Sequence, residues 1–181
     1  MIDNLNQLYL VMRISSCFAI IIGIFIALFQ LFLFRKQYKA AHEWNRRSTA
    51  FSYSFSGDPE MLQVLTRLDE HFKISSTTSC EISLDIINKT ITNYPQARND
   101  IHFSLARLEY MCTAIKQGVA DESICRDLLE NRTISFYRFF RQYIDDVREL
   151  RGSQKIMENL EYYANKWASK KVFPKRNPTG T

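Results

Sequence analysis

Two patterns of apolar residues divide this chain. Between Ile14 and Phe34 the sequence ISSCFAIIIGIFIALFQLFLF contains no charged residue. As a helix rising 1.5 Å per residue it spans about 31 Å, which matches the hydrocarbon thickness of a bilayer. The apolar core of a cleaved signal peptide is shorter, about 7–15 residues, and is followed by small residues, whereas Arg35 and Lys36 follow here. The pattern therefore predicts a transmembrane helix over residues 14–34.

Beyond this segment, apolar residues recur at the three- and four-residue spacings of amphipathic helices. The clearest series lies between Pro95 and Gly118, and the whole chain has only five glycines and four prolines to interrupt helices. Asp58 and Pro59 form the expected start of another helix, as its N-cap and first residue. The expected helices run from the membrane segment to near residue 55 and over residues 59–72, 80–91, 95–117, 133–150 and 154–167, with a short segment from Asp121. We expect an all-α protein whose transmembrane helix continues into a cytoplasmic helical bundle.

The division that follows has four parts: a short extracytoplasmic N-terminus (1–13), the transmembrane helix (14–34), the cytoplasmic bundle (35–171) and a disordered basic tail (172–181). The positive-inside rule sets the orientation, because the basic residues near the apolar segment follow it, apart from Arg13. We therefore expect a single-pass membrane protein whose N-terminus lies outside and whose C-terminal bulk lies in the cytoplasm. Arg35, Lys36 and Lys39 are expected to contact anionic lipid headgroups, in keeping with the net charge of +5.

The helix is expected to leave the membrane intact, because residues 32–51 contain no Gly or Pro. Trp44 then lies about 15 Å beyond Phe34, too far for an interfacial tryptophan, so we expect it to pack within the bundle. A set of residues is predicted to bind a partner or to hold the bundle together, and its members are Trp44, Arg46, Arg47 and Glu109. Within this set we expect an ion pair between Arg47 and Glu109.

Small and polar residues inside the apolar segment indicate contact between copies of the helix. Gly23 and the pair Ser15 and Ser16 allow two helices to approach closely. Gln30 is better placed against another helix or water than against lipid. We therefore expect self-association, with Gln30 lining a pore where the assembly encloses one. A monomer with Gln30 near the inner boundary of the bilayer stays an alternative.

Signatures of catalysis are sparse. The sequence has no GxSxG, HExxH, P-loop or dinucleotide-binding motif, and its four cysteines and three histidines show no metal-ligand spacing, so we expect no metal and no cofactor. Aromatic residues over 136–143 alternate with Arg138 and Arg141, a composition that could bind single-stranded nucleic acid. At helical spacing, however, these aromatic residues pack inward, which argues against direct nucleic-acid binding.

Two pairs of Arg and His lie four residues apart, Arg67 with His71 and Arg98 with His102. On a helix each pair shares a face and could act on a phosphodiester as clamp and general base, although a solvated helix face also explains both pairs. The arrangement is similar to the signature of the helical ribonucleases of prokaryotic defence systems, the higher eukaryote and prokaryote nucleotide-binding (HEPN) family. That family places four to six residues between Arg and His, whereas three stand here. The resemblance implies Arg98 and His102 as the catalytic residues of a membrane-tethered ribonuclease.

Three stretches, EWNRRSTAF, LARLEYMCTAIKQGVADE and YYANKW, resemble a bacterial family of single-pass membrane proteins of unknown function. This resemblance implies a small helical bundle on a membrane stalk and no assigned reaction. The size, the anchor and the partial ribonuclease pattern are more loosely similar to small membrane accessory proteins of type VI-B CRISPR loci. That similarity implies antiviral oligomers whose pore damages the host membrane once an RNA-guided effector protein has detected a phage transcript.

From the sequence we therefore expect a non-enzymatic, membrane-anchored helical module that self-associates at the inner membrane. Its expected partners are a second copy of itself, the lipid bilayer and, under the looser resemblance, an RNA-guided effector protein. A pore-forming defence effector and a membrane-tethered ribonuclease are the alternatives.

Overall fold

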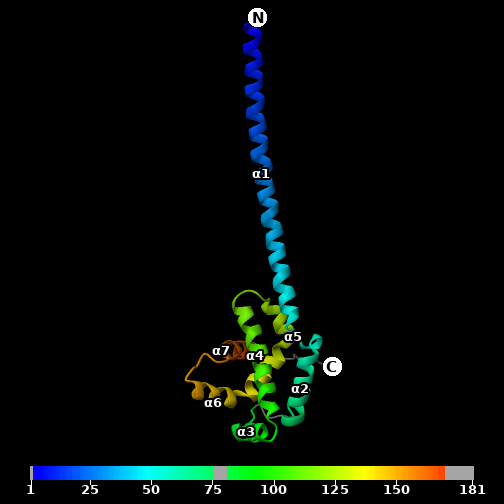
Figure 1. Ribbon diagram of the computed structural model, residues 1–181, viewed down its shortest axis with the longest axis vertical. Helices are drawn as coiled ribbons and strands as arrows, with labels where there is room; N and C mark the ends of the chain where they lie inside the picture. Colours follow the sequence, from blue (N-terminus) through cyan, green and yellow to red (C-terminus); the bar gives the residue numbers. More distant parts are fainter. Residues whose placement is uncertain (1, 76–80, 170–181) are drawn as a thin grey trace, which may run out of the picture. The chain divides into compact units, whose positions relative to one another are not determined.

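The computed structural model describes residues 2–75 and 81–169. It is all-α, and the described residues form no strand (Figure 1). The helices are α1 (Ile2–Ser52), the short 3-10 helix η1 (Phe55–Gly57), α2 (Pro59–Phe72), α3 (Leu84–Asn93), α4 (Gln96–Lys116), α5 (Glu122–Phe139), α6 (Arg141–Arg151) and α7 (Glu158–Ser169). The predicted fold class is confirmed. The predicted basic tail, residues 172–181, lies outside the described residues.

The chain forms two compact units, Met1–Trp44 and Asn45–Thr181. The first contains α1 as far as Trp44, and its side chains from Ile21 to Trp44 are all exposed. The segment Ile21–Ser52 is long and apolar enough to cross a membrane, and none of its apolar window is buried by the rest of the protein.

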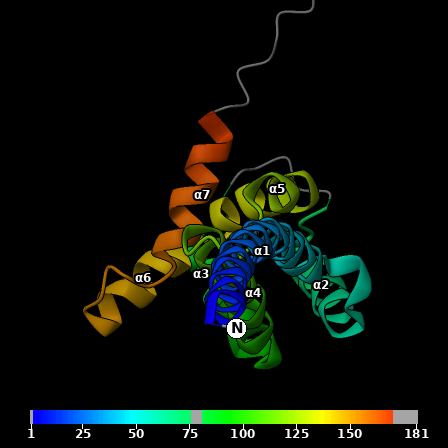
Figure 2. The ribbon, with the colours of Figure 1, turned by 90° about the horizontal axis from the view of Figure 1, so that it is seen from above.

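The second unit is a helical bundle organised around α4, which contacts α2, α3, α5 and α7. In both views α2 and α6 lie on opposite sides of α4 (Figure 1 and Figure 2). The largest side chains that are completely buried include Trp167, Phe140, Leu108 and Met111. The bundle therefore has one core, to which α2, α4, α5, α6 and α7 each contribute buried apolar residues.

Several helix ends follow the local signals in the sequence. The Asp58 side chain accepts a hydrogen bond from Met61 N at 3.1 Å, and Pro59 is the first residue of α2. The Asp121 side chain accepts hydrogen bonds from Ser123 N at 3.0 Å and Ile124 N at 3.3 Å, which caps α5. Gly118, with φ of +70°, follows α4 in the left-handed conformation that glycine adopts at least cost.

Other boundaries differ from the prediction. The expected break before residue 133 is absent, because α5 runs from Glu122 to Phe139 as one helix, and the break comes instead at Phe140. There the last carbonyl of α5 accepts a hydrogen bond from Ile82 N at 3.2 Å, so a distant segment satisfies the helix end. The last helix begins at Glu158 and not at residue 154, because Met157 has φ of 55° and cannot continue a right-handed helix.

Candidate functional site

Over residues 23–30, one face of α1 carries only small or amide side chains, and Phe34, which is 64 % exposed, follows in the same sector one turn later. At about 100° per residue, Gly23, Ala27 and Gln30 lie within one narrow sector of the helix. All three are exposed, and a Cβ added at Gly23 would meet no atom within 4 Å. The fold of this chain therefore does not itself require glycine there. We call these three residues the small face of α1.

The opposite face of the same helix is bulky. It presents Phe18, Phe25, Phe29 and Phe32, which are 60–68 % exposed. Small residues let two membrane helices approach closely, whereas large apolar side chains suit contact with lipid. The sequence analysis used Gly23 and Gln30 but missed Ala27, although its four-residue distance from Gly23 is the signal that identifies it.

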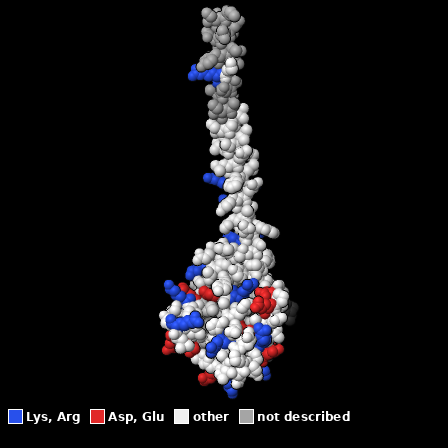
Figure 3. Space-filling view, in the orientation of Figure 1, with Lys and Arg blue, Asp and Glu red and all other residues white. Residues whose placement is uncertain are grey.

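The expected headgroup contacts lie directly after the apolar stretch. Arg35, Lys36 and Lys39 are all exposed on α1. Between Arg13 and Arg35 no Lys, Arg, Asp or Glu interrupts the helix (Figure 3). The structure thus places a basic cluster at one end of an uncharged surface, which is the arrangement that anionic lipid would recognise.

Trp44 is not a core residue, because its side chain is 72 % exposed. From this stretch of α1 the bundle core takes the small side chain of Ala50, which is completely buried, while Phe51 remains 59 % exposed. The expectation that Trp44 packs within the bundle was therefore wrong. A role for Trp44 in binding a partner stays a prediction.

The predicted ion pair between Arg47 and Glu109 was also wrong. The Glu109 carboxylate accepts hydrogen bonds from the backbone N–H of Leu160 at 2.7 Å and of Asn159 at 3.3 Å. It thereby caps α7, where free N–H groups and the helix dipole favour a negative charge. Arg47 is exposed and forms no ion pair in the described part of the chain.

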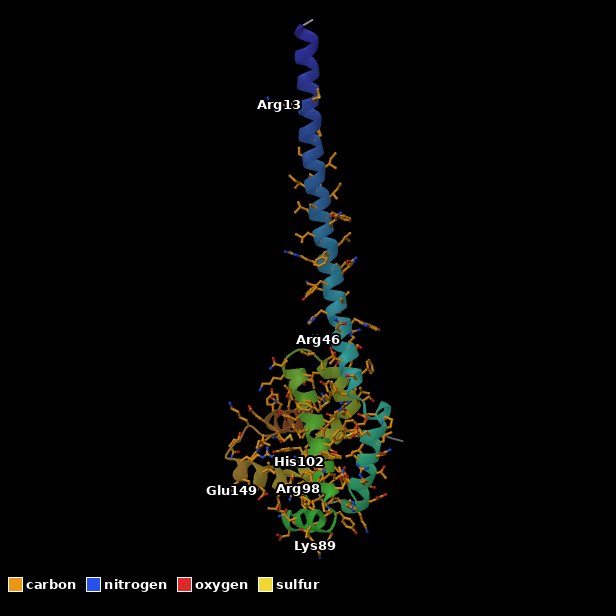
Figure 4. All side chains as sticks on the ribbon, in the orientation of Figure 1. Arg13, Arg46, Lys89, Arg98, His102 and Glu149 are labelled. Atoms are coloured by element: carbon orange, nitrogen blue, oxygen red, sulfur yellow. The ribbon has the colours of Figure 1, made fainter. Side chains whose placement is uncertain are left out.

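Arg46, and not Arg47, forms an ion pair in this part of the chain, and its partner is Asp121. Its guanidinium lies 3.7 Å from the Asp121 carboxylate, and its carbonyl accepts a hydrogen bond from Asp121 N at 3.3 Å (Figure 4 labels Arg46). Hydrogen bonds from Ser123 and the Arg46 charge lower the pKa of Asp121 below its ordinary value. Two members of the predicted set, Arg46 and Glu109, therefore do hold elements of the bundle together, through partners that the sequence did not reveal.

Arg98 and His102 lie one turn apart on α4 (Figure 4). Arg98 is exposed, and His102 is half-buried with its Nε2 atom 2.6 Å from the Tyr143 hydroxyl of α6. Burial lowers the pKa of His102, and the charges of Arg151 and Arg98 act in the same direction. Both effects favour the neutral imidazole, whose Nε2 atom contacts the Tyr143 hydroxyl.

The side chains of the other pair, Arg67 and His71, each contact a different residue of the bundle. The Arg67 guanidinium donates two hydrogen bonds, both of 2.8 Å, to the Asp100 carboxylate, which is 2 % exposed. His71 stacks on Tyr94 with a distance of 4.4 Å between ring centroids. Asp100 was not predicted, although it lies between Ala97 and Ser104 on the buried face of α4.

A second buried charge, Arg148, was missed as well. It is 6 % exposed and donates hydrogen bonds to the Glu161 carboxylate at 2.8 Å and to the carbonyl of Ile156 at 2.9 Å. Although burial acts to raise the pKa of Glu161, hydrogen bonds from Tyr137 and Arg148 bring it below its ordinary value. This network joins α5, α6 and α7.

Among the described residues, the cysteine thiols of the bundle are buried and the other side chains form no metal site. Cys112 and Cys125 are buried and free, and burial raises the pKa of the Cys125 thiol to about 12. Such thiols are poor nucleophiles. Among the described residues no group of His, Cys, Asp and Glu side chains is placed to hold a metal ion.

Comparison with known protein families matches residues 17–167 to the family described as Domain of unknown function (DUF4760). No curated protein and no solved structure matches the chain.

Proposed function

For a chain that belongs to the DUF4760 family of domains of unknown function, we propose a function from its own residues: a membrane-anchored helical interaction module that self-associates. The observation that carries this proposal is the two-sided surface of α1. Its small face offers Gly23, Ala27 and Gln30, while its opposite face offers four exposed phenylalanines.

Insertion into a bilayer follows from the exposed apolar surface. Side chains such as Phe25, at 68 %, and Leu28, at 59 %, are largely unburied. Each would gain about 1.5–3 kcal/mol on removal from water. The basic cluster of Arg35, Lys36 and Lys39 then favours an orientation with this end and the bundle in the cytoplasm and the N-terminus outside a bacterial inner membrane.

Self-association follows from the small face. In hydrocarbon the Gln30 amide lacks water, and an amide or backbone group on a second α1 can replace it. Hydrogen bonds of this kind between membrane helices contribute roughly 1–2 kcal/mol in model peptides. Gly23 and Ala27 would bring the two backbones close enough for that contact.

The mass of the full-length protein in detergent, measured by light scattering with the detergent contribution subtracted, tests this proposal. We expect a discrete oligomer that Gly23→Leu and Gln30→Leu each shift towards the monomer. Ile24→Leu is the matched control, because it changes side-chain shape beside the small face without adding volume on it. A monomeric wild type, or variants with the wild-type mass, would contradict self-association through this face.

A pore-forming defence effector is the second candidate, and the position of Gln30 on the small face favours it. An assembly of six or more chains, together with ion leakage from vesicles that Gln30→Leu abolishes, would support a pore lined by this residue. Only then does an RNA-guided effector protein become the partner to test. A dimer that causes no ion leakage would contradict the pore and support the interaction module.

The membrane-tethered ribonuclease rests on the resemblance of the pair formed by Arg98 and His102. Its test is the cleavage of RNA by the wild type and by His102→Ala at equal concentration. Equal rates would exclude these residues as a catalytic pair.

A further inference from the structure

A cavity of about 120 Å³ lies within the bundle between α4, α6 and the turn that precedes α7. Its aliphatic wall consists of Leu105 from α4 with Ile144 and Val147 from α6. Apolar cavities of about 150 Å³ accept a molecule the size of benzene. At about 120 Å³ the space is somewhat smaller, so it suits a short branched chain or part of a single small ring.

Two polar side chains interrupt this wall, His102 and Tyr143, whose Nε2 and hydroxyl oxygen lie 2.6 Å apart. A neutral imidazole has one N–H and a tyrosine one O–H, and the contact between them uses one of these two donors. Neither side chain has a second hydrogen bond within the described part of the protein. Whichever tautomer is present, one donor of the pair is left over.

The charges around the pair are mainly positive. Arg151 lines the cavity, and both Arg151 and Arg98 are close enough to act on the pKa values of His102 and Tyr143. Asp146 is the acidic residue with an opposing effect on Tyr143. Since Arg151 and Arg98 are exposed, an anion could approach them from solvent.

The side of the cavity formed by the turn before α7 is fixed before any ligand binds. Ile156 and Met157 line the cavity, and the Ile156 carbonyl accepts the hydrogen bond from the buried Arg148 at 2.9 Å. Met157 holds a φ of 55°, a conformation that a non-glycine residue adopts only when its surroundings impose it. A wall fixed in this way lowers the entropic cost of ligand binding.

We propose that this cavity binds a small apolar monocarboxylate. Its ring or branched chain lies against Leu105, Ile144 and Val147, and its carboxylate pairs with Arg151 while accepting the remaining hydrogen bond of the His102–Tyr143 pair. Arg151 is the arginine on the cavity wall, and together with a single donor it matches one carboxylate, whereas a doubly charged phosphate requires more donors than this wall supplies. The inference is independent of how α1 assembles.

Benzoate is the probe, added to full-length protein in lipid nanodiscs with ¹³C-labelled methionine methyl groups. The chain has five methionines, and Met157 is the one on the cavity wall. The Met157 methyl signal, assigned by its loss in Met157→Leu, should shift on titration and saturate, because the bound ring lies beside it. Benzyl alcohol, which lacks the charge, and acetate, which lacks the ring, should bind at least tenfold more weakly.

Two variants separate the elements of the site. Arg151→Gln should weaken benzoate binding by roughly tenfold or more, because a charge-assisted hydrogen bond is lost. Val147→Phe should abolish binding by filling the cavity. Arg138→Gln is the matched control, an exposed arginine on α5. An unsaturated drift of all methionine signals, or wild-type binding by Arg151→Gln, would overturn the proposal, and the second result is decisive even where Val147→Phe does not fold.

Discussion

Helices α1 and α4 are both rich in apolar residues, yet most of those of α4 are buried by the rest of the chain and those of α1 between Ile21 and Phe34 are not. In α4 the apolar residues recur every three or four positions, and Ile101, Leu105 and Leu108 are at most 2 % exposed. Between Ile21 and Phe34 of α1, apolar residues occupy all sides of the helix and are 40–68 % exposed. The periodicity of the apolar residues, more than their number, therefore decides whether a helix is buried by its own chain or needs another partner.

The polar residues of the two regions repeat this contrast. In the bundle, Asp100 and Arg148 are buried and each has charged partners close by. On α1, Gln30 is exposed, and its side-chain amide forms no hydrogen bond within the described residues. Asp100 and Arg148 are satisfied by other residues of the bundle, whereas in a membrane the Gln30 amide would have to be satisfied by another molecule.

Removal of the buried charge should give the largest effect. Arg148→Met leaves Glu161 without its cationic partner and the Ile156 carbonyl without a donor, so we expect a loss of about 3–5 kcal/mol in the free energy of unfolding. Arg138→Met, at an exposed position, should change it by less than about 0.5 kcal/mol. Urea unfolding followed by circular dichroism measures both. Equal losses would show that Arg148 does not hold the bundle together.

A matched pair of leucines tests the comparison between the helices. Leu108 is completely buried and Leu28 is 59 % exposed. Leu108→Ala should destabilise the bundle by about 2–5 kcal/mol, because it removes packing and leaves a cavity. Leu28→Ala should leave the urea midpoint of the bundle unchanged, since α1 contributes no packing at this position. A similar shift from both substitutions would contradict the division into two regions.

The sequence was sufficient wherever the determinant is local. The amphipathic spacing of α4, its end near Gly118 and the cap at Asp58 depend on residues within a few positions, and each was predicted. The break at Phe140 depends on a hydrogen bond from Ile82, and the partner of Glu109 depends on how α7 lies against α4. Such contacts join distant segments, so charge and spacing alone could not identify them.

Loss of the α5 cap should have an intermediate effect. Asp121→Ala removes the side-chain acceptor for Ser123 N and Ile124 N and the ion pair with Arg46, so we expect a loss of about 1 kcal/mol. Asp127→Ala, an exposed aspartate within the same helix, is the control. Thermal unfolding of both variants gives the difference. An Asp121→Ala protein as stable as the control would contradict a stabilising role for the Asp121 cap.

The smallest effect should come from pH. The pKa of His102 lies below its ordinary value of 6.5 in the folded protein, owing to burial and to Arg151 and Arg98. Below pH 6.5 the unfolded chain therefore binds a proton that the folded protein resists, and stability falls as the pH decreases. His102→Gln should reduce this loss between pH 7.5 and 5.5 in urea unfolding. An unchanged pH dependence would mean that the native environment of His102 does not disfavour its charge.

Amide hydrogen exchange of the full-length protein in lipid nanodiscs tests the central claim most directly. We expect amides of α1 between residues 21 and 34 to exchange as slowly as the core of α4, because lipid excludes water from a helix that no other part of the chain covers. In detergent-free buffer this protection would be absent. Fast exchange of residues 21–34 in nanodiscs, alongside a protected α4, would contradict a membrane-spanning α1.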